Sequence, residues 1–182
     1  MSDYLNSRLK KIEAYTPGEQ PQDKSYIKLN TNESPFPPSK GVIDAITQDE
    51  IKNLRLYSDP ECKALKEEFA RVYNVGSENV FLSNGSDDIL NFAFMAYGNK
   101  GAVYADITYG FYSVFAELYG VESEIIPLKE DFSLDVDAFL GKNKFIVIAN
   151  PNAPTGMEIS LEDIERILAT NKESVVLIDE AY

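Results

Sequence analysis

The sequence has 182 residues and a formal charge of −13, from 17 basic and 30 acidic side chains. This acidic excess argues against a nucleic-acid partner and against an anionic membrane surface. The chain contains no histidine, which excludes Ser-His-Asp and Cys-His catalysis, an imidazole base and His-ligated zinc. Its chemistry must therefore come from carboxylates, tyrosines, lysines or a bound cofactor.

The sequence also bears on the compartment. The N-terminus is polar and lacks the apolar segment of a secretory signal, and no apolar run approaches the roughly 20 residues of a membrane span. Cys62 is the single cysteine, so an internal disulfide is impossible, which fits a reducing environment. We therefore expect a cytoplasmic protein with no metal site and no membrane partner.

The first part of the chain is predicted to be irregular. Residues 1–29 are rich in polar residues, Pro and Gly and are assigned to an N-terminal arm that ends in a short strand at 26–29. Three prolines make residues 30–39 an irregular loop. Residues 40–54 favour a helix followed by a turn.

Beyond residue 60, helical and strand patterns alternate. An amphipathic helix is predicted first, with its apolar stripe at Leu65, Phe69, Val72 and Tyr73. Strands are then expected at 80–82, 101–107, 121–127, 145–149 and 175–178, and helices at 89–97, 111–119, 135–140 and 161–168, the last capped by Ser160. The alternation predicts an α/β fold with a mainly parallel sheet flanked by helices, incomplete and spanning residues 30–182.

Two loops after predicted strands carry candidate ligand contacts, because ligands of open α/β sheets bind beyond the carboxyl ends of the strands. In residues 84–87, a glycine turn opens a helix whose N-terminal N–H groups suit a phosphate. The same residues would alternatively only cap the helix. Tyr109, after the next strand, is placed either to lie on a flat ligand or to fill the core.

Two further features complete the pattern. Residues 150–156, N-P-N-A-P-T-G, specify a rigid loop because two prolines and a glycine restrict its backbone. The apolar strand 175–178 runs directly into Asp179. That carboxylate would either meet a ligand or simply meet water.

These four features, in this order, resemble the large domain of fold-type-I pyridoxal-phosphate aminotransferases. Within that group, three stretches are similar to the histidinol-phosphate aminotransferases. They are K-L-N-T-N-E-S-P at 28–35, R-L-Y-S-D-P at 55–60 and N-G-S-D-D-I at 84–89. The resemblance covers residues 15–182, which is nearly the whole chain.

The resemblance implies pyridoxal 5'-phosphate as the cofactor and assigns it contacts. Asp179 would pair with the pyridine nitrogen and keep it protonated. Tyr182 would donate to the phenolic oxygen of the ring, and Tyr109 would stack on the ring. The backbone N–H groups of Ser86 and Asp87 would hold the phosphate.

The resemblance further implies a homodimer. Tyr57 would reach across the interface to the phosphate bound by the neighbouring subunit, while Tyr15 and Asn32 would lie near the substrate. The family has an asparagine directly before P-T-G, hydrogen-bonded to the phenolic oxygen, where this chain has Ala153. Asn152, one residue earlier, is the candidate to replace it.

The implied reaction is histidinol-phosphate:2-oxoglutarate transamination in histidine biosynthesis. The family's Schiff-base lysine lies a few dozen residues beyond D-E-A-Y, the motif with which these 182 residues end. We therefore expect an N-terminal portion that is inactive by itself. The alternatives are a pyridoxal-phosphate decarboxylase or lyase, an aromatic amino-acid aminotransferase of the same fold, or a non-catalytic binding domain that kept the fold.

Overall fold

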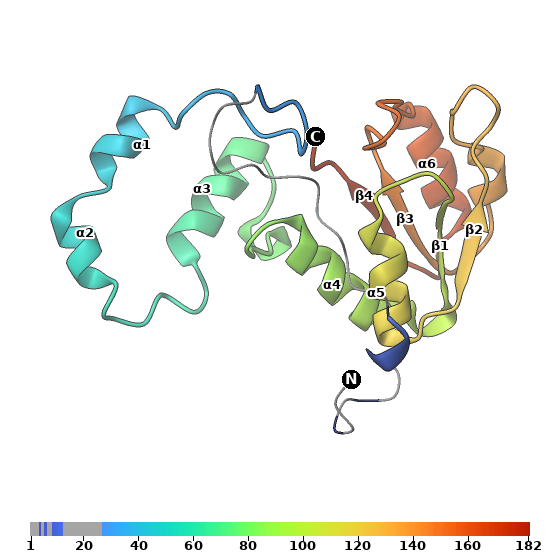
Figure 1. The fold of residues 1–182 in the computed structure, drawn as a ribbon, viewed down its shortest axis with the longest axis horizontal. Helices are drawn as coiled ribbons and strands as arrows, with labels where there is room; N and C mark the ends of the chain where they lie inside the picture. The colour runs from blue at the N-terminus through green and yellow to red at the C-terminus, as the bar shows by residue number, and fades with distance from the viewer. Residues whose placement is uncertain (1–3, 5, 7–8, 13–26) are drawn as a thin grey trace. The chain divides into compact units, whose positions relative to one another are not determined.

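The computed structural model describes residues 4, 6, 9–12 and 27–182. The chain divides into two compact units, residues 83–182 with residues 1–12, and residues 13–82. The boundary expected after residue 29, between an N-terminal arm and the large domain, stays a prediction. Figure 1 gives the course of the chain, and each unit is described by itself.

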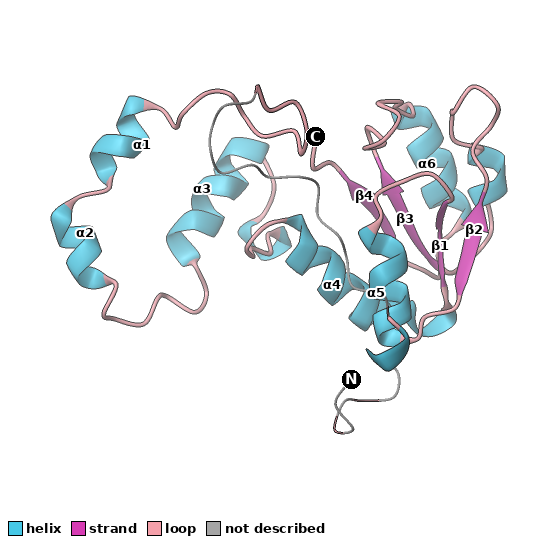
Figure 2. Ribbon diagram, viewed as in Figure 1, coloured by secondary structure: helices cyan, strands magenta, loops and turns pink. Residues whose placement is uncertain are grey.

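The first unit is built on a four-stranded sheet in which every pairing is parallel (Figure 2), so the predicted fold class is confirmed. The spatial order is β2-β1-β3-β4, which means that the chain moves outward in one direction after β1 and in the other after β3. Ligands of open sheets bind at such a reversal. The strands are β1 (Ala102–Ala105), β2 (Ser123–Ile126), β3 (Phe145–Ala149) and β4 (Val176–Asp179).

Helices and short 3-10 turns connect and cover these strands. They are α4 (Ser86–Tyr97), η3 (Gly98–Lys100), α5 (Phe111–Tyr119), η4 (Val136–Phe139) and α6 (Leu161–Thr170), and the unit also contains η1 (Leu9–Lys11). Local sequence signals set their ends: α5 stops at Gly120, whose φ of 66° suits glycine, and the Ser160 Oγ accepts the Asp163 N–H at 3.1 Å to begin α6. The predicted N-cap at Ser160 is thus confirmed.

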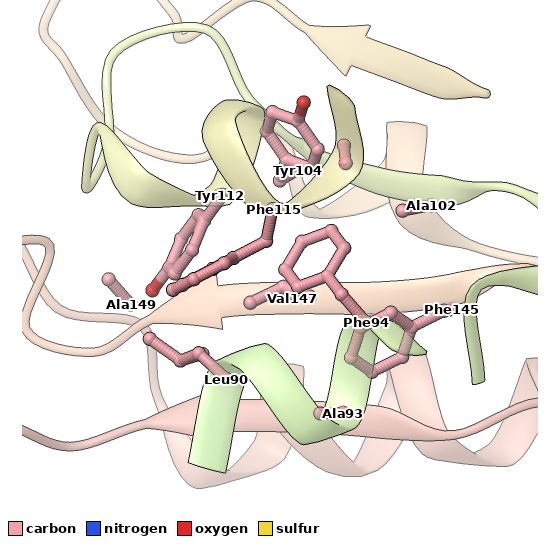
Figure 3. Close-up of a cluster of buried hydrophobic side chains, with 11 residues drawn as sticks. Leu90, Ala93, Phe94, Ala102, Tyr104, Tyr112, Phe115, Phe145, Val147 and Ala149 are labelled. Carbon is pink, nitrogen blue, oxygen red and sulfur yellow. The ribbon is translucent and has the colours of Figure 1, made fainter. Parts of the chain in front are cut away.

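The two central strands, β1 and β3, are buried on both faces, and alternate side chains along a strand point to opposite faces. Phe145 and Val147 pack with α4 and α5 in one apolar cluster (Figure 3), while Ile146 and Ile148 pack with α6 and η4 in another. β4 is less buried than β1 and β3: its residues are only half-buried, since it forms an edge of the described sheet.

The second unit, as far as residues 27–82 describe it, is helical. The helix predicted over 40–54 is broken in two at Ile46 and Thr47, and no strand forms at 80–82 or over the described part of 26–29. Ala70 and Val80 are the only buried apolar residues within 27–82. Its elements are α1 (Lys40–Ala45), α2 (Gln48–Asn53), α3 (Lys63–Tyr73) and η2 (Ser77–Asn79).

Across the part of the chain that the structure describes, no helix combines the length and the apolar sequence needed to cross a bilayer.

Candidate functional site

A pocket in the sheet unit opens at the carboxyl ends of β3 and β4. Together with the solvent space that opens into it, the pocket measures about 360 Å³. Its walls come from four separate segments: the start of α4, the loop after β1, the loop after β3 and the residues that end and follow β4. The lining residues are Ser86, Tyr109, Ala149, Pro151, Ala153, Asp179, Ala181 and Tyr182.

Asp179 reaches this pocket because of its position on β4. Leu177, two residues earlier, packs against the cluster formed with α4 and α5, so strand periodicity directs Asp179 to the same face. There its Oδ2 accepts a hydrogen bond of 2.7 Å from the Tyr112 hydroxyl. Among the described residues none donates to the other oxygen, Oδ1. One oxygen of the carboxylate is therefore held by the protein, and the other is available to a ligand.

Tyr112 was not singled out from the sequence. It lies in the first turn of α5, and its ring centroid is 5.7 Å from that of Tyr109 in edge-to-face geometry. Its side chain is fully buried. This burial, reinforced by the hydrogen bond to Asp179, raises the pKa of Tyr112 far above its usual range. Tyr112 therefore stays a neutral hydrogen-bond donor.

The start of α4 offers backbone donors. Gly85 precedes the helix with a φ of 86° and provides no side-chain cap, and the first N–H groups of a helix have no acceptor within it. Ser86 and Asp87 are both exposed at this end. The Asp87 carboxylate is engaged separately, because its Oδ1 accepts the Tyr109 hydroxyl at 2.8 Å. The positive end of the helix dipole thus lies beside the pocket.

The loop after β3 is joined to the loop after β1. Asn152 Nδ2 donates to the Ile107 carbonyl oxygen at 2.9 Å and to the Thr155 Oγ1 at 3.1 Å. These two partners use both amide protons of the side chain. Asn152 is accordingly directed to its own loop and the neighbouring one, whereas Ala153 lines the pocket. The hydrogen bond from Asn152 to a ligand stays a prediction.

Two other predicted residues, Tyr57 and Asn32, are not among those that line this pocket. Tyr57 and Asn32 belong to the unit of residues 13–82, where both are exposed. Tyr15 lies outside the described residues. The pocket therefore brings together Ser86, Tyr109, Asp179 and Tyr182 from among the predicted contacts, with Asp87 beside Tyr109.

The groups around the pocket fit a flat, phosphorylated heteroaromatic ring. A helix N-terminus suits the phosphate, and the half-buried ring of Tyr109 forms part of the wall. Asp179 presents one carboxylate oxygen, which is a partner for a protonated ring nitrogen. Pyridoxal 5'-phosphate has a group for each of these contacts.

An open parallel sheet with such a pocket beyond the carboxyl ends of its strands has the architecture of α/β domains that bind ligands. The family described as aminotransferase class I and II matches residues 24–182. The chain belongs to this family.

The named relatives are more specific. The chain is 53% identical to a histidinol-phosphate aminotransferase of Clostridium acetobutylicum over 184 residues, which take in 100% of this chain and 52% of that one. It thus spans about half the length of the curated relatives it matches. The resemblance found in the sequence is confirmed.

Solved structures show the shared fold. The histidinol-phosphate aminotransferase of Sinorhizobium meliloti, in complex with pyridoxal-5'-phosphate, superposes with a TM-score of 0.73 at 24% identity, covering 82% of this chain and 42% of that one. An L-threonine-O-3-phosphate decarboxylase of Porphyromonas gingivalis has a TM-score of 0.63 at 21% identity, covering 74% and 40%. An aminotransferase and a decarboxylase therefore share this architecture.

Proposed function

We propose that the chain forms the cofactor-binding part of a histidinol-phosphate aminotransferase that uses pyridoxal 5'-phosphate. The observation that carries the proposal is Asp179, which lines a pocket together with Tyr109 and the start of α4 and whose Oδ2 is held by Tyr112. The 53% identity to a relative of that name supports the choice of substrate. The amino group would pass between glutamate and a phosphorylated imidazole ketone.

Each residue of the pocket is assigned a different contact with the cofactor. Asp179 accepts the ring N–H and keeps the proton on that nitrogen. Tyr109 covers one face of the ring, and Tyr182 donates to its phenolic oxygen. The N–H groups of Ser86 and Asp87 hold the phosphate. The chemistry that pyridoxal phosphate supplies when bound is an electron-accepting ring that stabilises negative charge on the substrate carbon.

The proposal also covers the whole protein. This chain corresponds to 52% of its relative, so we assign the cofactor contacts to these residues and the complete transamination to the whole protein. Tyr15 and Asn32 are proposed to lie near the substrate. Tyr57 is proposed to contact the phosphate held by a second subunit, so the working form would be a homodimer. We also propose that the protein is cytoplasmic.

The cofactor site can be tested with 4′-deoxypyridoxine 5′-phosphate, which keeps the ring nitrogen and phosphate but has no aldehyde to condense with lysines. Calorimetry should show that the chain binds this ligand and that Asp179→Asn weakens binding at least about tenfold, because the charged hydrogen bond to the ring nitrogen is lost. Glu180→Gln is the matched control: it removes the adjacent, exposed carboxylate and should leave binding unchanged.

Equal binding by Asp179→Asn and the unsubstituted chain would contradict the proposed cofactor contacts. The substrate is tested separately in the whole protein, by following amino transfer from glutamate to imidazole-acetol phosphate. Release of carbon dioxide from phosphothreonine without amino transfer would instead select the decarboxylase that shares this fold.

A further inference from the structure

A buried hydrogen bond joins Tyr112 to the back of the candidate site. The Tyr112 side chain is 0% exposed, and its hydroxyl donates to Asp179 Oδ2 at 2.7 Å. The two residues lie 67 positions apart in sequence, on α5 and β4. The proposed contacts to the cofactor use Asp179 and do not use Tyr112.

Aromatic neighbours hold the Tyr112 ring in place. Its centroid lies 6.4 Å from that of Phe94, 6.0 Å from that of Tyr104 and 5.7 Å from that of Tyr109, the last two in edge-to-face geometry. Figure 3 shows the ring within the cluster, with its hydroxyl oxygen at the end where Ala149 lies. Ala149 is itself a lining residue of the pocket. The packing therefore directs the hydroxyl to the wall of the pocket.

Toward Asp179 the hydroxyl acts as the donor. Burial and the neighbouring carboxylate both raise the pKa of Tyr112, so the phenol keeps its proton. A phenylalanine in its place would leave Asp179 Oδ2 against an apolar ring. The carboxylate would then gain by turning toward water, and a ligand would have to turn it back before binding.

We propose that Tyr112 is a positioning residue, which fixes Asp179 Oδ2 so that Oδ1 faces the pocket and pairs with a protonated ring nitrogen. The inference rests on the proposed function, because it names a residue that acts on the same cofactor through Asp179. It predicts that replacing Tyr112 weakens the binding of ligands that have a ring nitrogen and not of ligands that lack one.

Two ligands separate this role from a general effect on the fold. One is 4′-deoxypyridoxine 5′-phosphate, and the other is its deaza counterpart, with C–H in place of the ring nitrogen. Tyr112→Phe should weaken binding of the first about tenfold, the size expected for one charged hydrogen bond, and change binding of the second less than about twofold. A merely structural role would weaken both alike.

Tyr104→Phe is the matched control. Tyr104 lies in the same cluster, and its hydroxyl donates to Ser123 Oγ at 2.9 Å, on β2 rather than at the pocket. This variant also removes one hydroxyl from the core, and it should leave the affinities of both ligands unchanged. A selective loss in Tyr104→Phe equal to that in Tyr112→Phe would overturn the assignment.

A double variant tests whether Tyr112 affects binding through Asp179 or through a general change in the fold. With Asp179→Asn present, adding Tyr112→Phe should not weaken the pyridine ligand further, because the residue through which Tyr112 acts has been altered. Additive losses overturn the positioning role alone. If the unsubstituted chain binds both ligands equally, the proposed role of Asp179 fails, and the inference for Tyr112 fails with it.

Discussion

The two units of the chain carry similar apolar patterns but bury them differently. In residues 83–182 apolar side chains fill a cluster on each face of the sheet. In α3, by contrast, Phe69 and Tyr73 stack on each other at 4.3 Å and both remain exposed. Helical spacing decides which side chains share a face, whereas burial needs a second element opposite that face. The sheet is that second element in one unit, and residues 27–82 contain no strand.

The largest expected effect compares one aromatic residue from each unit. Phe94 is 0% exposed and packs against four other aromatic rings, while Phe69 is 40% exposed. Phe94→Ala should lower the free energy of unfolding by about 3–5 kcal/mol because it leaves a cavity, and Phe69→Ala by about 1 kcal/mol or less. Urea unfolding followed by far-UV circular dichroism measures both. Equal losses would mean that α3 has a core of its own.

An intermediate effect is expected at the two side-chain N-caps. Ser160 Oγ accepts the Asp163 N–H at 3.1 Å to start α6, and Thr47 Oγ1 accepts the Glu50 N–H at 3.3 Å to start α2. Ser160→Ala should cost about 1 kcal/mol of global stability, since α6 contributes Ile167 to the core.

Thr47→Ala should instead speed amide exchange within α2 and leave global unfolding nearly unchanged, because α2 has no buried residue. Hydrogen exchange and urea unfolding of the same two samples separate the outcomes. A loss of global stability as large as that of Ser160→Ala would show that α2 folds cooperatively with a core.

The smallest effect is a dependence on pH in the sheet unit. Hydrogen bonds from Lys142 and then Lys144 lower the pKa of Glu124, which lies on β2. A lowered pKa in the folded state adds stability above the ordinary value of 4.5, and that stability is lost as the pH falls through the lowered value.

As the pH is lowered from about 6 to 3, the midpoint temperature of thermal unfolding should therefore fall less steeply for Glu124→Gln than for the unsubstituted chain. Asp59 in the other unit is the control, because backbone N–H groups of Lys63 and Glu61 lower its pKa where it is fully exposed. Asp59→Asn should change the slope less. If Glu124→Gln leaves this slope unchanged, the ion pairs of Glu124 with Lys142 and Lys144 do not contribute to stability.

Much of the sheet unit was predictable from short-range patterns. The runs predicted at 101–107, 121–127, 145–149 and 175–178 all contain strands, because apolar residues between turn signals suit a sheet covered on both faces. The run at 80–82 did not become a strand, although its composition is similar. Strand formation requires a partner with free backbone groups, and a short apolar run does not specify one.

The motifs identified in the sequence placed Asp179, Tyr109 and Ser86 at strand ends and a helix start, and all three line one pocket. They did so because the carboxyl ends of parallel strands lie at one edge of a sheet. The side chains that bind these residues could not be identified from the sequence. Tyr112, which holds Asp179, had the pattern of an ordinary core residue of an amphipathic helix.

The sequence by itself determined the fold class, the family and the polar residues at the strand ends, because each depends on residue types within a short stretch. Tertiary structure decided that Tyr112 binds Asp179 Oδ2 and that the amide of Asn152 donates to the Ile107 carbonyl. Those contacts join residues 67 and 45 positions apart, and the order β2-β1-β3-β4 is what brings them together. Strand order arises from packing across the whole sheet, and no local pattern encodes it.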